Sequence, residues 1–149
     1  KAKFCISATA KRDGMHLIAV IMGAPTRDIR NAEAAKLLDW GFANYSLYTY
    51  PPCDQGTIKL LGAKADSLTC RTDGISILVP IGAASKVTVV TEISERVSAP
   101  VTEGDAVGKL TFKLDGDQVG EAKIISSASA NRITFAELLF ILIQRFILW

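Results

Sequence analysis

The segment APVTEGDAVGKLTFKLDGDQVGEAKIIS, residues 99–126, decides the fold of this 149-residue chain. It contains two short stretches rich in β-forming residues, KLTFKL and EAKIIS, and two turn sequences, TEGD and LDGD. Short strands separated by turns that contain Gly and Asp are typical of an antiparallel sheet. The same alternation begins near Thr57, and no helix of any length fits between the turns. We therefore expect residues 51–130 to form an all-β sandwich domain.

The first fifty residues have a different pattern. Phe4, Ile6 and Ala8 alternate with smaller or polar side chains, which predicts a strand with one buried face. The turn sequence KRDG follows at residues 11–14, and residues 15–22 are apolar enough for a strand buried on both faces. We therefore expect a hairpin at the start of this segment.

A helix is predicted after this hairpin, over residues 25–45 (PTRDIRNAEAAKLLDWGFANY). Pro25 and Thr26 form a start signal, and Glu33 and Lys36 are spaced to pair on the solvent face. Its apolar residues recur at intervals of three and four positions: Ala32, Ala35, Leu38 and Phe42. Because a lone hairpin is marginal in water, this segment is interpreted as the tail of a larger α/β layer that precedes Lys1.

Two adjacent prolines in YTYPPCDQG, residues 48–56, predict a linker after this helix. The predicted domains are therefore residues 1–50, residues 51–130 and residues 131–149. The predicted fold class is α+β: an α/β tail, an all-β sandwich and a C-terminal helix.

The segment NRITFAELLFILIQRFILW, residues 131–149, predicts an amphipathic helix. Its polar residues, Thr134, Glu137, Gln144 and Arg145, fall within an arc of roughly 100° on a helical wheel. A helix over residues 135–149 is about 22 Å long, shorter than the roughly 30 Å hydrocarbon layer. The gain from its apolar residues and the cost of its two charges also roughly cancel for full insertion.

A helix that lies in the membrane interface avoids both problems, so we expect a membrane anchor of that kind. A helix packed against the sandwich is the alternative, and a full span is less favoured. The anchor candidates are the large apolar residues of this segment: Phe135, Leu138, Leu139, Leu142, Phe146 and Trp149.

Composition excludes several other classes of function. The formal net charge is +2, and no segment combines Lys and Arg with interleaved aromatics, which argues against nucleic-acid binding. Cys5, Cys53 and Cys70 make no metal-ligand spacing with His16, so we expect no metal and no cofactor. Free thiols are the simpler expectation, although a disulfide between Cys53 and Cys70 stays open.

No catalytic constellation is predicted. His16 lies in an apolar strand without a nearby carboxylate, and no Ser is followed three residues later by Lys. The sequence SAN, residues 129–131, matches an S-x-N pattern, but Ser and Asn are common in turns and caps before a helix. Lys64 in GAKAD does not occupy the hairpin position that lipoyl or biotinyl carrier domains modify. The predicted set of catalytic residues in this chain is therefore empty.

Two segments carry a resemblance to a known family. ISATAKRDGMHLIAVIMGAPT (residues 6–26) and NAEAAKLLDWGF (residues 31–42) closely resemble the D-alanyl-D-alanine carboxypeptidases, the low-molecular-mass penicillin-binding proteins. Residues 99–126 are similar to the last strands of the family's C-terminal β domain, and the terminal helix is similar to its membrane anchor. The matching positions in the first two segments are Ala8, Thr9, Met22, Gly23, Arg30, Ala32, Glu33, Lys36, Leu37, Leu38, Trp40, Gly41 and Phe42.

The resemblance implies that residues 1–50 are the end of a penicillin-binding, transpeptidase-like catalytic domain. It implies that the S-x-x-K, S-x-N and K-T-G motifs lie upstream of Lys1, so that this chain alone is inactive. The parent would be a serine-type carboxypeptidase that trims D-Ala from peptidoglycan stem peptides, bound through the upstream domain, at the outer face of the bacterial cell membrane. The alternative is a stand-alone, non-catalytic β-sandwich module that binds a membrane surface.

Overall fold

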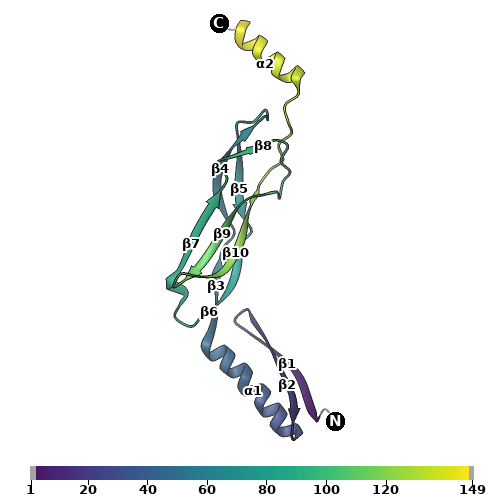
Figure 1. Ribbon diagram of the computed structural model, residues 1–149, viewed down its shortest axis with the longest axis vertical. Helices are drawn as coiled ribbons and strands as arrows, with labels where there is room; N and C mark the ends of the chain where they lie inside the picture. The colour runs from purple at the N-terminus through teal and green to yellow at the C-terminus, as the bar shows by residue number, and fades with distance from the viewer. Residues whose placement is uncertain (1–2, 148–149) are drawn as a thin grey trace. The chain divides into compact units, whose positions relative to one another are not determined.

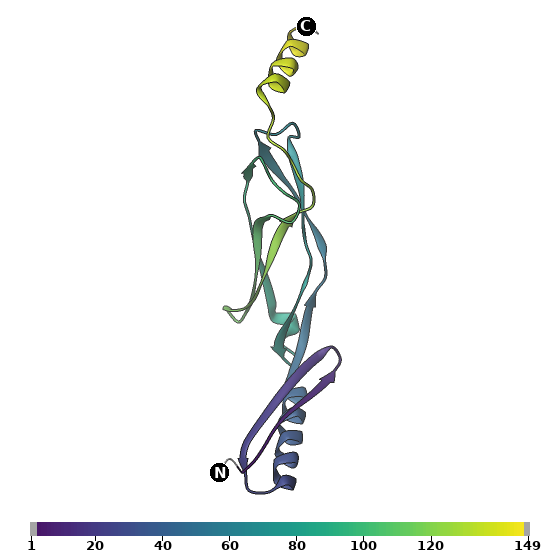
Figure 2. The ribbon, with the colours of Figure 1, turned by 90° about the vertical axis from the view of Figure 1, so that its right-hand side faces the viewer.

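The computed structural model describes residues 3–147, which form two units (Figures 1 and 2). Unit 1 groups Lys1–Thr49 with Ser76–Val87, and unit 2 groups Tyr50–Ile75 with Thr88–Trp149. Unit 1 mixes strands with a long helix, whereas unit 2 consists mostly of strands and ends in a helix. The predicted β character of the second half of the chain and its C-terminal helix are confirmed.

Unit 1 opens with an antiparallel hairpin of β1 (Phe4–Arg12) and β2 (Met15–Ala24). Its two-residue turn is Asp13–Gly14, with φ values of 50° and 81°. Positive φ at both central residues suits a tight hairpin turn, and an Asp-Gly pair provides it at low steric cost. The sequence KRDG therefore predicted this turn correctly.

The two faces of β2 differ, which corrects the expectation that this strand is buried on both sides. Met15 and Ala19 are buried, while Ile18, Val20 and Met22 are 65%, 59% and 79% exposed. Side chains alternate between the two faces of a strand, and α1 covers only one face of this hairpin (Figure 2). Among the described residues, the second face of β2 is exposed. An apolar run in the sequence does not reveal whether both faces of a strand are covered.

Helix α1 (Arg27–Asn44) begins at Thr26, whose Oγ1 accepts a hydrogen bond from Ile29 N at 3.2 Å. This is an ordinary N-cap, and it confirms the predicted helix start. The predicted ion pair between Lys36 and Glu33 is also present, at 2.9 Å.

The predicted buried face of α1 is only partly right. Ala34 and Gly41 are the buried residues of this helix, whereas Ala32 and Ala35 are exposed. Small residues allow the helix to approach the hairpin closely: a Cβ atom at Gly41 would lie 2.5 Å from Leu17 Cδ1. Leu38 and Phe42 of the predicted face are half-buried, so the spacing was right for these two larger residues and wrong for the two alanines.

Polar side chains also attach α1 to the hairpin. Arg30 Nη1 donates a hydrogen bond to the carbonyl oxygen of Cys5 at 3.3 Å. At the other end of the helix, the Arg12 guanidinium lies 4.6 Å from the centre of the Phe42 ring, a cation–π contact, and 3.8 Å from an Asp39 carboxylate oxygen. The hairpin and helix are thus held together along most of their length.

The predicted linker is a strand connection instead. β3 (Tyr45–Tyr50) and β4 (Cys53–Leu61) are separated by two prolines only. β3 pairs with β6 (Ile75–Pro80) in a separate two-stranded sheet, and β6 is followed by a 3₁₀ turn, Ala84–Lys86. The structure therefore groups residues 76–87 with unit 1, whereas the expected 51–130 domain contained them.

Unit 2 holds a six-stranded sheet in the order β7-β9-β10-β5-β4-β8. β4 and β8 run parallel, whereas β4–β5, β5–β10 and β9–β10 are antiparallel. The strands other than β4 are β5 (Ser67–Thr72), β7 (Val87–Ile93), β8 (Arg96–Ser98), β9 (Ala106–Leu114) and β10 (Asp117–Ser126). β9 and β10 are joined by an Asp115–Gly116 turn with φ values of 50° and 98°, a second turn of the kind seen in β1–β2.

The core of unit 2 is centred on β9 and β10. Leu110, Phe112 and Ile124 are completely buried, and the ring of Tyr50 packs edge-on against Phe112 with centroids 5.3 Å apart. Along β5, burial alternates, with Leu68 and Cys70 buried and their neighbours exposed. This alternation matches a sheet with one face in the core.

Candidate functional site

The C-terminal helix α2 (Phe135–Ile147) begins with a reciprocal set of hydrogen bonds. Thr134 N and Thr134 Oγ1 donate to Glu137 Oε2 at 2.9 and 2.8 Å, and Glu137 N donates to Thr134 Oγ1 at 3.4 Å. This arrangement is a capping box, which satisfies backbone N–H groups that a helix start otherwise leaves unpaired. The sequence TFAE carries its T-x-x-E signature, so this feature was available from the sequence although we did not use it.

The capping contacts lower the pKa of the Glu137 carboxyl. The largest cause is the hydrogen bond from the Thr134 backbone N–H, followed by the bond from its hydroxyl. The nearby positive charge of Lys64 acts in the same direction. Glu137 is therefore ionised at neutral pH and fixes the first turn of α2.

Large apolar side chains cover most of the surface of α2. Phe135 and Phe146 are 80% and 87% exposed. The other described anchor candidates, Leu138, Leu139 and Leu142, are also exposed. Trp149, the sixth candidate, lies outside the described residues. Such exposure is not what packing of the helix against the sheet predicts, and exposed apolar patches mark membrane or protein contact sites.

No helix within residues 3–147 combines the length and the apolar character needed to cross a membrane.

Backbone hydrogen bonds fix the segment that leads into α2. Ile133 N donates to the carbonyl oxygen of Gly62 at 2.8 Å, and Ala63 and Arg132 form an antiparallel bridge. Further upstream, Val101 and Ala130 exchange two hydrogen bonds of 2.9 and 2.8 Å. The helix therefore starts directly beside the turn between β4 and β5.

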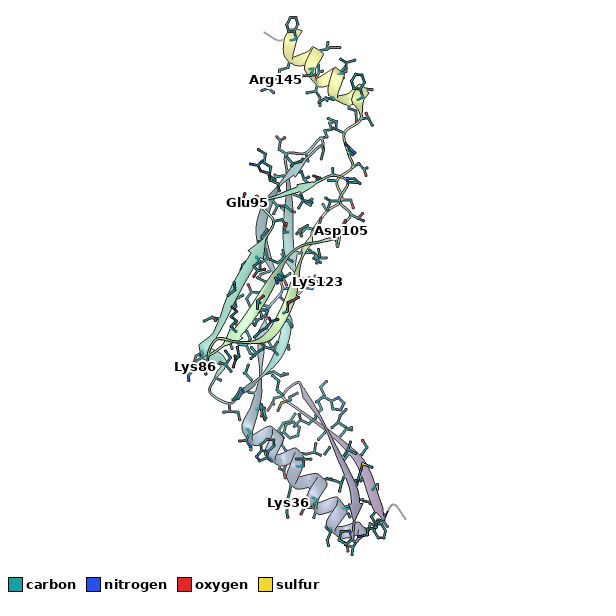
Figure 3. The ribbon with its side chains drawn as sticks, viewed as in Figure 1. Lys36, Lys86, Glu95, Asp105, Lys123 and Arg145 are labelled. Atoms are coloured by element: carbon teal, nitrogen blue, oxygen red, sulfur yellow. The ribbon has the colours of Figure 1, made fainter. Side chains whose placement is uncertain are left out.

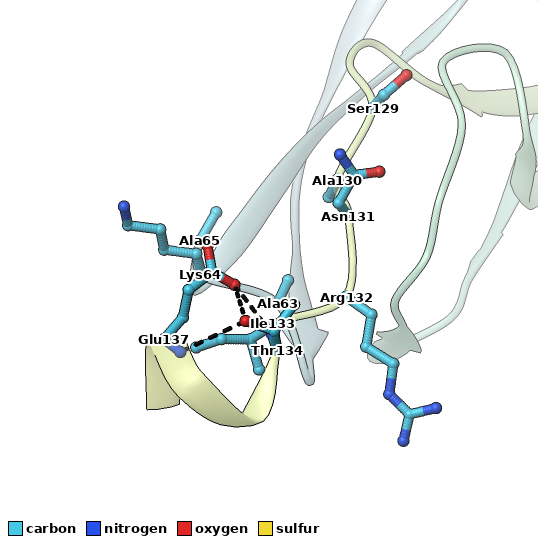
Figure 4. A pocket seen from close by; sticks show the side chains of 10 residues that line it. All are labelled: Ala63, Lys64, Ala65, Ser129, Ala130, Asn131, Arg132, Ile133, Thr134 and Glu137. Atoms are coloured by element: carbon cyan, nitrogen blue, oxygen red, sulfur yellow. Dashed lines mark hydrogen bonds between the residues drawn. The ribbon is translucent and has the colours of Figure 1, made fainter. Parts of the chain in front are cut away.

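A pocket of about 410 Å³ lies at this junction (Figure 4). It is formed by residues 63–65 of the β4–β5 turn, residues 129–134 and Glu137. Lys64 and Arg132 contribute its cationic side chains, which extend in different directions from opposite sides of the helix start (Figure 4). Neither side chain forms an ion pair within 4.0 Å among residues 3–147.

The residues considered for catalysis are not brought together. Ser129 Oγ accepts a hydrogen bond from Glu103 N at 2.9 Å, a structural role. His16 is exposed in β2, opposite Lys11 of β1, and Lys64 lies in the β4–β5 turn. Residues 3–147 contain no group of three His, Cys, Asp or Glu side chains that could hold a metal ion.

Cys5, Cys53 and Cys70 form no disulfide among the described residues. Cys70 is completely buried in β5, where burial, and secondarily the charge of Asp54, raises the pKa of its thiol. Cys53 lies within hydrogen-bond range of Gln55 Nε2, at 3.0 Å, and of the Tyr50 hydroxyl, at 3.5 Å. The possible disulfide between Cys53 and Cys70 is therefore not formed.

Comparison with known proteins gives consistent results. Residues 55–132 match the family model described as "Penicillin-binding protein 5, C-terminal domain". D-alanyl-D-alanine carboxypeptidase DacF of Bacillus subtilis is 30% identical over 139 residues, which is 91% of this chain and 36% of the relative. D-alanyl-D-alanine carboxypeptidase DacA of Haemophilus influenzae is 30% identical over 132 residues, 80% of this chain and 31% of the relative.

A solved structure shows the same fold. Penicillin-binding protein 5 from Haemophilus influenzae superposes with a TM-score of 0.75 at 27% identity, over 86% of this chain and 39% of that one. The chain thus spans about a third of the length of the curated relatives it matches.

Proposed function

Since the chain belongs to the penicillin-binding protein 5 C-terminal domain family, and its relatives are D-alanyl-D-alanine carboxypeptidases, we propose that it serves as the membrane-attached C-terminal part of such an enzyme. In this proposal the parent enzyme is serine-type and removes the terminal D-Ala of peptidoglycan stem peptides. Unit 2 is a spacer, α2 is the anchor, and the protein works at the outer face of the bacterial cell membrane. The observation that carries the proposal is the exposed apolar surface of α2 on a domain of this family.

Unit 1 is proposed to complete a transpeptidase-like catalytic domain. The outer face of β2 supports this assignment, because Ile18, Val20 and Met22 are exposed together on one side of a two-stranded sheet. A face of this kind is stabilised when another layer covers it, and the matched relatives are about three times longer than the matched region. The S-x-x-K, S-x-N and K-T-G motifs are assigned to that additional layer, so the stem peptide binds there and unit 1 contributes support.

The anchor role of α2 follows from its surface. Transfer of a large apolar side chain from water to an apolar environment contributes about 1.5 to 3 kcal/mol. Glu137 and Arg145 share one arc of α2 with Ile141, and the other apolar residues lie around the rest of the helix, so a helix in the interface buries most of the apolar side chains and leaves the two charges in the headgroups. Such binding is reversible and requires no span.

The direct test is binding of the full chain to vesicles of phosphatidylcholine, measured by co-sedimentation. The double variant Leu139→Glu/Phe146→Glu places two charges on the apolar surface of α2 and should abolish binding. Leu78→Glu/Ile81→Glu is the matched control, since it adds the same charges at two exposed apolar positions of unit 1. Unchanged binding of the α2 variant would contradict the anchor role, and equal loss in the control would show a non-specific charge effect.

The catalytic assignment has its own test. The chain alone should not be acylated by fluorescent penicillin, because the proposed nucleophile is outside it. A relative that contains all three motifs serves as the positive control on the same gel. Stoichiometric labelling of this chain would show that a serine within it is the nucleophile.

A further inference from the structure

We propose that unit 2 itself contacts the membrane at the start of α2, where Lys64 and Arg132 bind the phosphate groups of anionic phospholipids. This inference rests on the proposed anchor role of α2. It adds a lipid preference that the helix alone does not provide and assigns that preference to two residues of the β domain.

Lys64 and Arg132 both lie at the start of α2. Arg132 is bridged to Ala63, and Ile133 N donates to Gly62 O at 2.8 Å, so the β4–β5 turn and the run-in to α2 are fixed together. Thr134 and Glu137 then start the helix within the next turn. A helix that begins here and lies in the interface necessarily brings Lys64 and Arg132 to the level of the headgroups.

The positive charge at the start of α2 comes from Lys64 and Arg132. The described part of α2 carries one acidic residue, Glu137, and one basic residue, Arg145, so the helix contributes no net charge. The Glu137 carboxylate is occupied by the N–H and hydroxyl of Thr134. The two cations beside it have no ion-pair partner within 4.0 Å among residues 3–147, so they remain available to external phosphates.

The directions of the two basic side chains determine how many headgroups they can contact. Lys64 and Arg132 project from opposite sides of the helix start (Figure 4), so they do not converge on a single anion. Each side chain is expected to reach a separate headgroup. A guanidinium matches a phosphate with two parallel hydrogen bonds, and an ammonium acts as a compact point charge, so both suit this contact.

The test measures partition of the full chain into two kinds of vesicle, phosphatidylcholine alone and phosphatidylcholine with about one third phosphatidylglycerol. One cation near an anionic surface strengthens binding about fivefold, so Lys64→Gln/Arg132→Gln should weaken binding to the anionic vesicles about 30-fold. Binding to the neutral vesicles should change less than about twofold, because phosphatidylcholine has no net charge and its surface does not attract cations. Raised salt should remove most of the difference between the vesicles.

The matched control is Lys86→Gln/Lys123→Gln, which lowers the net charge by the same amount. Lys123 lies on β10 of unit 2 and Lys86 in the 3₁₀ turn of unit 1 (Figure 3), and neither residue lines the pocket. This control should retain the preference for anionic vesicles. Far-ultraviolet circular dichroism of both double variants establishes that the fold is unchanged.

The outcomes separate the two proposals. Wild-type binding to both vesicles with equal strength would overturn the lipid-phosphate site while the anchor role stands. Absence of binding to either vesicle would overturn both. Equal weakening by the two double variants would also overturn the site, because net charge alone would then explain the preference.

Discussion

Gly108 shows how closely β9 approaches β7 in unit 2. A Cβ atom at this position would lie 2.5 Å from the carbonyl oxygen of Glu92 and 3.1 Å from Ile93 Cα. Both neighbours are backbone atoms of a strand, which cannot move aside as the end of a flexible side chain can. At this position the sheet therefore requires a residue without a side chain.

We predict that Gly108→Ala lowers the free energy of unfolding by about 1 to 3 kcal/mol, the usual cost of overpacking a tight site. The adjacent Lys109→Ala is the control, since it removes only an exposed ion pair with Glu92 of 3.3 Å and should cost less than about 1 kcal/mol. Urea unfolding followed by hydrogen exchange of peptides from β7 and β9 gives both values for unit 2. Similar values for the two variants would mean that β7 and β9 separate easily.

Single residues also explain which thiol chemistry is available. Cys70 is buried and the pKa of its thiol is raised, so little thiolate forms at neutral pH. Cys5 is exposed at the start of β1, where its sulfur accepts a weak hydrogen bond from Gly23 N at 3.5 Å. The cysteines are therefore distinguished by their surroundings, and the sequence, which shows only their spacing, could not rank them.

At the scale of one element, α2 depends on its first turn. The folded-state pKa of Glu137 is lowered, so the capping contribution is present above the unfolded-state pKa and is lost as the pH falls through the lower folded value. The helix start should accordingly loosen in acid, below the ordinary Glu pKa of about 4.3. Neutral and alkaline conditions leave the cap intact.

We predict that Thr134→Ala raises the pKa of Glu137 toward its ordinary value without reaching it. The variant removes the hydroxyl donor but keeps the backbone N–H, which is the largest cause of the shift. Carbon-detected NMR titration of the Glu137 carboxyl measures the change, and Thr134→Ser, which retains a hydroxyl, should restore most of it. An unchanged pKa in Thr134→Ala would mean that the hydroxyl hydrogen bond of 2.8 Å is absent in solution.

Elements with strong local signals were predictable, and elements set by distant partners were not. The Asp-Gly turns, the Thr26 cap of α1 and the apolar surface of α2 all depend on residues within a few positions of each other. β3 was missed because the prolines after it suggested a linker, although its pairing with β6 is what makes it a strand. The buried face of α1 was predicted only in part, because Ala34 and Gly41 carry too little apolar surface to stand out in a pattern.

The candidate site combines residues that are close in the sequence with residues that are far apart. Five of the six anchor candidates lie among the described residues and all five are exposed, while their role as an anchor stays a prediction. The junction of Gly62, Ala63 and Ile133 joins segments about seventy residues apart, and no local pattern indicates such a contact. Arg132 was therefore not a candidate until the β4–β5 turn was seen beside it.

At the scale of the whole molecule, the two units differ in how much core they contain. Among residues 3–147, the largest fully buried side chains include six from unit 2: Cys70, Thr72, Leu110, Phe112, Ile124 and Ser126. In unit 1, Val79 is the completely buried residue among residues 3–147, and several of its other buried positions are Ala. Burial of apolar surface dominates stability, so the units should not be equally stable.

We predict that amide hydrogen exchange is slowest in β9 and β10 and much faster in β1 and β2. A two-stranded sheet with an exposed face is marginal in water, and local opening exposes its amides without unfolding the rest. Exchange measured by mass spectrometry on peptides from each unit tests this ranking. Equal protection in β1 and β9 would mean that unit 1 is stabilised by more than the packing of α1 on its hairpin.

The chain passes between the two units three times, after Thr49, after Ile75 and after Val87. Exchange of gene segments at a single breakpoint near residue 50 therefore cannot transfer either unit intact. β6 would arrive with the C-terminal segment of one parent, and its partner β3 would stay with the N-terminal segment of the other. A recombinant of two relatives should fold well only where β3 and β6 come from the same parent. This pair of strands therefore favours inheritance of the two units as one piece.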